Sequence, residues 1–168
     1  MGVKYTTKKD GFPEMRKRAK LIDGKSVEVG VLNGDHAWLA PIHEYGLDIE
    51  VTPAMRAYLH SQGLHLKNST THIHIPERSF LRTGYDENID GILRKARLLV
   101  ADYLAGKISE EALHKAVGLE LSTAIKDYAR DLSNPANHPY TVDQKGSSNP
   151  LVETGDMIGG ITWRVANE

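Results

Sequence analysis

The chain has 168 residues, of which 40% are hydrophobic and 26% charged, and its formal net charge is −1. These values are typical of one globular domain over residues 1–168 and argue against a molecule that binds polyanions over its whole surface. Cysteine is absent, which excludes a disulfide framework and a thiolate metal site.

The N-terminal segment, residues 1–24, is basic. Residues 1–25 hold eight basic side chains against three acidic ones: Lys4, Lys8, Lys9, Arg16, Lys17, Arg18, Lys20 and Lys25 against Asp10, Glu14 and Asp23. Phe12–Ile22 is predicted to form a short helix that Gly24 ends. The basic charge fits either a solvated surface helix or a surface that contacts DNA or an acidic partner. The segment lacks the apolar middle of a signal peptide, so we expect synthesis in the cytoplasm.

The next stretch is predicted to hold two strands and two short helices. Ser26–Leu32 alternates apolar and polar residues, as does Ser69–Pro76, and both are typical of strands. Between them, Asp35 is expected to cap a short helix that ends at Gly46 and buries Trp38, Leu39 and Ile42. Thr52 is expected to cap a second helix that has Pro53 in its first position.

Two long amphipathic helices are predicted next. The apolar stripe of the first comprises Leu81, Tyr85, Ile89, Ile92, Ala96, Leu99 and Tyr103. Ser109 is expected to cap the second, whose stripe comprises Val117, Leu121, Ile125, Tyr128 and Leu132. Glycines are costly inside helices, so we expect close packing or a kink at Gly84 and Gly91, and a break at Gly118.

The last 36 residues are expected to form a flexible loop and a strand. Residues 133–150 contain three prolines and almost no apolar periodicity, as is typical of a long loop. Thr154 is expected to cap one helical turn, and Ile161, Trp163 and Val165 share one face of a closing strand. The predicted fold is α+β: a small antiparallel sheet packed against two long helices, with a long flexible loop before the C-terminal strand.

No catalytic motif emerges from the sequence. His72 and His74 share one face of a predicted strand, a spacing that can chelate a metal, but the polar face of an edge strand is the more common explanation. His43-Glu44 does not continue into a metalloprotease helix motif, because residue 47 is leucine. The chain has no G-x-S-x-G elbow and no phosphate-binding loop. We therefore expect a non-enzymatic protein without a catalytic residue, cofactor, bound metal or small-molecule substrate.

Three sequence pieces together resemble a known family. They are "IHEYG" (residues 42–46), "IPERSFLR" (residues 75–82) and "NPLVETGDMIGGITWRV" (residues 149–165). In this order and spacing they resemble the tail-completion proteins, also called head–tail joining or neck proteins, of long-tailed double-stranded DNA bacteriophages and related prophages. The resemblance spans about residues 25–166. Ser79 stands where the family commonly has a second proline, and the link over residues 47–74 is longer than in many relatives.

The resemblance implies a structural protein of the virion. Such a protein assembles in the host cytoplasm into a ring at the tail or neck, with a hexamer as one candidate stoichiometry, and contacts itself and other tail or neck proteins. It implies no membrane, and it leaves contact with phage DNA at the channel open. The candidate subunit-interface residues are Glu77, Arg78, Arg82, Asp86, His43 and Glu44.

Two alternatives are open for the binding partners of the two arginines in the second motif. Arg78 and Arg82 are four residues apart, so on a helix they share one face and can form paired hydrogen bonds with a carboxylate of a neighbouring subunit. Alternatively, they pair locally with Glu77 or Asp86. Two other functions compete with the structural one: a nucleic-acid-binding module that uses the basic N-terminal segment, and a metal-dependent hydrolase built on His43, His72 and His74.

Overall fold

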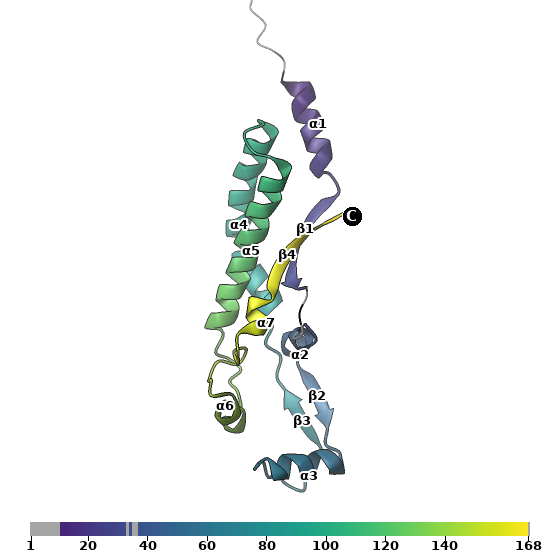
Figure 1. The fold of residues 1–168 in the computed structure, drawn as a ribbon, viewed down its shortest axis with the longest axis vertical. Coiled ribbons are helices and arrows are strands. Elements are labelled where there is room, and N and C mark those ends of the chain that lie inside the picture. The colour runs from purple at the N-terminus through teal and green to yellow at the C-terminus, as the bar shows by residue number, and fades with distance from the viewer. Residues whose placement is uncertain (1–10, 33, 35–36, 168) are drawn as a thin grey trace, which may run out of the picture.

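The computed structural model describes residues 11–32, 34 and 37–167, and its elements are shown in Figure 1. In chain order they are α1 (Phe12–Ile22), β1 (Lys25–Val31), α2 (Leu39–Tyr45), β2 (Leu47–Glu50), α3 (Pro53–Ser61), β3 (His72–Ile75), α4 (Phe80–Leu104), α5 (Glu110–Asp131), α6 (Pro139–Lys145), α7 (Asp156–Gly159) and β4 (Ile161–Asn167). The predicted α+β class is confirmed.

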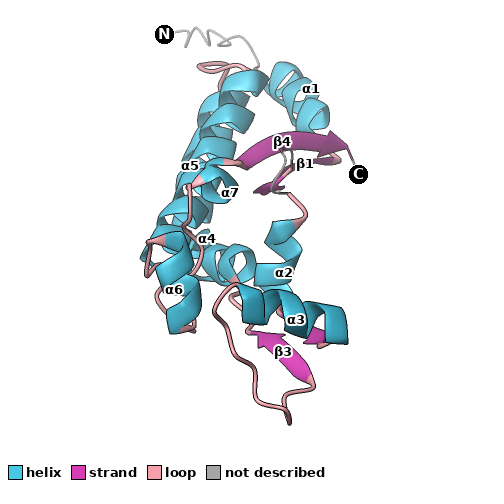
Figure 2. Ribbon diagram, turned by 60° about the horizontal axis from the view of Figure 1, so that its bottom comes forward, coloured by secondary structure: helices cyan, strands magenta, loops and turns pink. Residues whose placement is uncertain are grey.

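The strands form two separate antiparallel ribbons. β1 pairs with β4, with Val29 opposite Trp163, and β2 pairs with β3, with Ile49 opposite Ile73. The long helices α4 and α5 pack side by side, and α5 also packs against β1 and β4. Figure 1 shows the β2–β3 ribbon and α3 at the end of the molecule opposite α1, a separation that Figure 2 also shows. β1 and β4 form the predicted small antiparallel sheet against the long helices. β3, which was also predicted, does not join it but pairs with β2, a strand that the sequence analysis missed.

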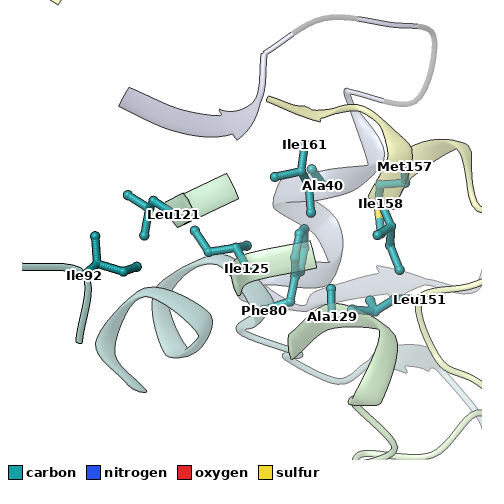
Figure 3. Close-up of a cluster of buried hydrophobic side chains, with 10 residues drawn as sticks. All are labelled: Ala40, Phe80, Ile92, Leu121, Ile125, Ala129, Leu151, Met157, Ile158 and Ile161. Carbon is teal, nitrogen blue, oxygen red and sulfur yellow. The ribbon is translucent and has the colours of Figure 1, made fainter. Parts of the chain in front are cut away.

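The core lies where α5 meets the start of α4 and the C-terminal segment. Its buried members are Ala40, Phe80, Ile92, Leu121, Ile125, Ala129, Leu151, Met157, Ile158 and Ile161 (Figure 3). Ile92 and Ile125 are buried as their stripes predicted. Tyr85 is 43% exposed, so its place in the apolar stripe of α4 was predicted wrongly. Phe80, which the stripe omitted, is fully buried.

Several local signals predicted the element boundaries correctly. α1 has the predicted bounds. The Thr52 hydroxyl accepts a hydrogen bond from the Met55 amide at the start of α3, and the Ser109 hydroxyl accepts one from the Ala112 amide at the start of α5. Each cap pairs a helix N–H with an oxygen three residues earlier, so it depends only on nearby sequence.

Other expectations need correction. Trp38 is 64% exposed rather than buried, because it precedes α2 and lies outside the face that Leu39 and Ala40 turn toward the core. The Asp35 cap lies outside the described residues. Gly118 does not break α5: a Cβ there would lie 2.3 Å from Cδ2 of Trp163, so the glycine lets the indole ring of β4 pack directly on the helix backbone.

The segment 133–150 contains the helix α6, which the sequence pattern did not predict. The Lys145 ammonium donates hydrogen bonds to the Asn149 and Pro150 carbonyls, each at 3.2 Å, and the Pro150 side chain is fully buried. α7 begins two residues after Thr154, whose hydroxyl accepts a hydrogen bond from the Asp156 amide at 3.4 Å.

Candidate assembly site at the start of helix α4

The first two sequence motifs lie against each other. α2 ends at Tyr45, and its C-cap residue Gly46 has a φ of +73°, which residues with a side chain rarely adopt. A Cβ at Gly46 would lie 2.8 Å from the Ile75 carbonyl oxygen and 2.9 Å from the Glu77 nitrogen. The Arg78 amide also donates a hydrogen bond to the His43 carbonyl at 2.7 Å. Glycine is therefore required where "IHEYG" crosses "IPERSFLR".

Glu44 of α2 caps the N-terminus of α4 from outside that helix. Its side chain is 4% exposed, and its carboxylate accepts hydrogen bonds from the Leu81 amide at 2.8 Å and the Arg82 amide at 3.0 Å. The Ser79 hydroxyl donates a third at 3.2 Å. The first amides of a helix have no partner within it, and the positive end of the helix dipole favours a carboxylate. Ser79, the N-cap residue, makes no side-chain cap of its own.

Arg82 links Glu44 to Glu77. The Arg82 Nε lies 2.9 Å from the Glu44 carboxylate, and its Nη2 donates to the Glu44 carbonyl at 3.1 Å and to the Glu77 carboxylate at 2.5 Å. Its guanidinium carbon lies 4.7 Å from the centre of the Tyr45 ring, a cation–π contact. The hydrogen bonds with Glu44 and Glu77 raise the pKa of Arg82. Half of the Arg82 side chain remains exposed. Of the two alternatives, Arg82 takes the local pairing with Glu77.

Arg78 makes a different set of contacts. It precedes α4 rather than lying on it, and it is only 4% exposed, so the expectation that both arginines lie on one helix face was wrong. Its guanidinium donates to the Pro135 carbonyl at 2.8 Å, the Asn137 side-chain oxygen at 3.1 Å and the Ala136 carbonyl at 3.3 Å. Burial lowers the pKa of Arg78. Arg78 thus holds the segment before α6 against the start of α4.

His43 lies beside this buried cation. Its Nδ1 is 3.5 Å from Arg78 Nη1. Desolvation, followed by the positive charges of Arg78 and Lys145, lowers the pKa of His43 to about 4. The imidazole is therefore neutral at pH 7, and its Nδ1 can accept a hydrogen bond from the guanidinium.

The structure brings five of the six candidate residues into this network. Asp86 is exposed and takes part in none of the ion pairs between described residues. The capping role of Glu44 escaped the sequence analysis, because the carboxylate and the amides it caps are 37 and 38 residues apart. The third motif joins through the core, where Leu151, Ile158 and Ile161 cluster with Phe80 (Figure 3).

The histidines of β3 do not form a metal cluster with other described residues. The His74 Nδ1 lies 2.7 Å from the Asp48 carboxylate across the β2–β3 ribbon, and the His72 Nδ1 lies 3.1 Å from the Thr71 hydroxyl. Over residues 11–32, 34 and 37–167, no group of three or more histidine and carboxylate side chains is placed to hold a metal. Within the same residues, no helix has the length and apolar character to cross a membrane.

Comparisons with protein-family models, with curated proteins and with solved structures give no match for this chain.

Proposed function

We propose that this chain is a structural protein of a long-tailed bacteriophage or prophage that completes the tail or neck and joins the tail to the head as a ring. The observation that supports this proposal is that the three motifs of the resemblance, which are far apart in the sequence, meet at one junction. Glu44 of the first caps the helix that the second opens, and Phe80 of the second packs with Leu151 and Ile161 of the third. Residues of the three motifs thus hold this junction of the fold together.

The outer surface of the molecule supports an assembly role. Large apolar side chains remain exposed on several elements, among them Phe12, Leu21, Tyr58, Leu98 and Leu119. Their exposed fractions run from 48% to 72%. A ring gives each subunit two contacts with its neighbours, in which exposed apolar side chains of this kind can be buried.

Labelling of intact particles tests this proposal. An antibody against the chain, bound to gold, is applied to purified particles of the phage or prophage that carries the gene. Gold at the junction of head and tail supports the proposal. Particles that join normally and carry neither label nor the chain by mass spectrometry overturn it.

A second candidate is a nucleic-acid-binding module, which α1 favours. Arg16, Lys17 and Lys20 are exposed on this helix, and none of its residues is buried. Binding through these side chains predicts an affinity for duplex DNA that falls steeply with salt. The affinity of the isolated chain for DNA at about 50 and 200 mM salt separates the two candidates, because strong binding at low salt that is lost at high salt favours the second.

A further inference from the structure

A cavity lies beside β3, at the side away from β2. It has a volume of about 370 Å³, and its walls come from the loop before β3, from β3 itself and from the segment that leads into α6. Consecutive residues from Ile73 to Pro76 line it, and no residue of β2 does. Figure 1 accordingly shows β3 between β2 and α6. Since side chains alternate between faces along a strand, lining by consecutive residues places the cavity at the edge of β3.

The backbone of β3 offers hydrogen-bonding groups at this edge. In an antiparallel pair, opposite residues alternate between bonding to each other and pointing away. The Val51 amide bonds to the Thr71 carbonyl at 2.8 Å, so Val51 and Thr71 form a bonded pair. Counting along the ribbon from there, Asp48 and His74 lie opposite each other three positions on and form a non-bonded pair. The amide and carbonyl of His74 therefore point away from β2. No backbone hydrogen bond between described residues outside the ribbon uses them.

The cavity is also positively charged. Its lining includes Arg78 but no aspartate or glutamate. The Arg78 guanidinium is bound by carbonyl oxygens, an amide oxygen and an imidazole nitrogen, and it has no carboxylate partner among the ion pairs of the described chain. A buried charge without a counter-ion is costly, so an anion that reaches it gains both charge pairing and hydrogen bonds. The remaining walls, including Leu64, Leu66 and Ile75, are apolar.

We propose that this cavity binds an extended segment of a partner protein, which adds as a strand to the open edge of β3 and directs an acidic side chain toward Arg78. Strand addition supplies backbone hydrogen bonds, while pockets for alternate side chains supply specificity. The apolar neighbours of the acidic residue fill the walls at Leu64 and Leu66. This binding goes beyond the proposed ring and is measured on the isolated chain, so its success or failure does not depend on virion assembly.

A peptide selection tests the proposal. The full chain is used as bait for a library of random 12-residue peptides displayed on yeast, and enriched peptides are synthesised for calorimetry. We expect enriched peptides with one acidic residue among alternating apolar ones. Replacing that acidic residue by its amide is expected to weaken binding at least fivefold.

Two variants separate the backbone of β3 from its side chain. His74→Pro removes the amide at the open edge without touching the β2 ladder, since proline is tolerated where the strand amide faces outward. We expect it to weaken peptide binding at least tenfold. The matched control His74→Ala keeps the amide and is expected to bind within twofold of the natural chain. Thermal melts establish that both variants fold.

Hydrogen exchange provides a readout on the natural chain. Bound peptide is expected to slow exchange of the His74 amide at least tenfold, which holds even if His74→Pro fails to fold. The proposal is overturned if no peptide is enriched. Enriched peptides that lack an acidic residue, or that leave both His74 exchange and binding to His74→Pro unchanged, overturn it as well.

Discussion

The Glu44 carboxylate joins two helices and is almost fully enclosed, whereas the Glu77 carboxylate binds the same arginine at the surface. Removing Glu44 leaves two helix amides and the Ser79 hydroxyl without an acceptor. We therefore expect Glu44→Ala to lower the free energy of unfolding by about 2–4 kcal/mol. The matched control Glu77→Ala removes an exposed ion pair and should cost about 0–1 kcal/mol. Urea denaturation measures both, and equal costs would contradict the capping role of Glu44.

His43 predicts a pH dependence of stability. Its pKa is 6.5 in the unfolded chain and about 4 in the folded one, so between these values the unfolded state binds more protons. Stability should therefore fall as the pH drops from 6.5 to 4 and change little further below that. The full effect would be about 3 kcal/mol, and solvent screening of a partly buried ring reduces it to about 1–2 kcal/mol.

The variant His43→Asn isolates this contribution. Asparagine keeps a hydrogen-bond acceptor near Arg78 and does not titrate. The natural chain should therefore lose about 1–2 kcal/mol of unfolding free energy relative to the variant as the pH falls from 6.5 to 4. Parallel curves over this range would show that His43 does not titrate as the geometry indicates.

At the scale of elements, alanine substitutions at two glycines inside helices are expected to change stability in opposite directions. Gly118→Ala forces the Trp163 indole away from α5 and should cost about 1–3 kcal/mol despite the better helix propensity of alanine. Gly91→Ala on α4 meets only the flexible end of Arg94, at 3.7 Å, and should stabilise by up to about 1 kcal/mol. Thermal melts of the two variants measure both effects. A stabilising Gly118→Ala would mean that β4 does not pack on α5 in this way.

The elements that the sequence predicted well depend on nearby residues. The bounds of α1 and the caps at Thr52 and Ser109 follow from patterns within a few positions. The predicted helix break at Gly118 was wrong because the role of this glycine depends on Trp163, which is 45 residues away. The exposure of Trp38 depends in the same way on which face of α2 the core covers, which its local pattern does not encode.

At the scale of the whole molecule, the pairing of the strands was the main feature that the sequence patterns did not predict. Alternation identified β1, β3 and β4 but missed β2, the short strand Leu47–Glu50. β1 pairs with β4 across 130 or more residues, and no local pattern indicates that β2 and β3 form a ribbon of their own. The candidate site was partly predictable: the motifs named five residues that do meet, while the burial of Arg78 and the capping by Glu44 required the fold.

Deletion of the gene tests the proposed function most directly. Particles of the phage or prophage that lack this protein are counted by electron microscopy, with and without the natural chain supplied from a plasmid. We predict separate DNA-filled heads and tails in its absence, and joined particles when it is restored. Joined particles at the natural frequency in the absence of the chain would contradict the proposal.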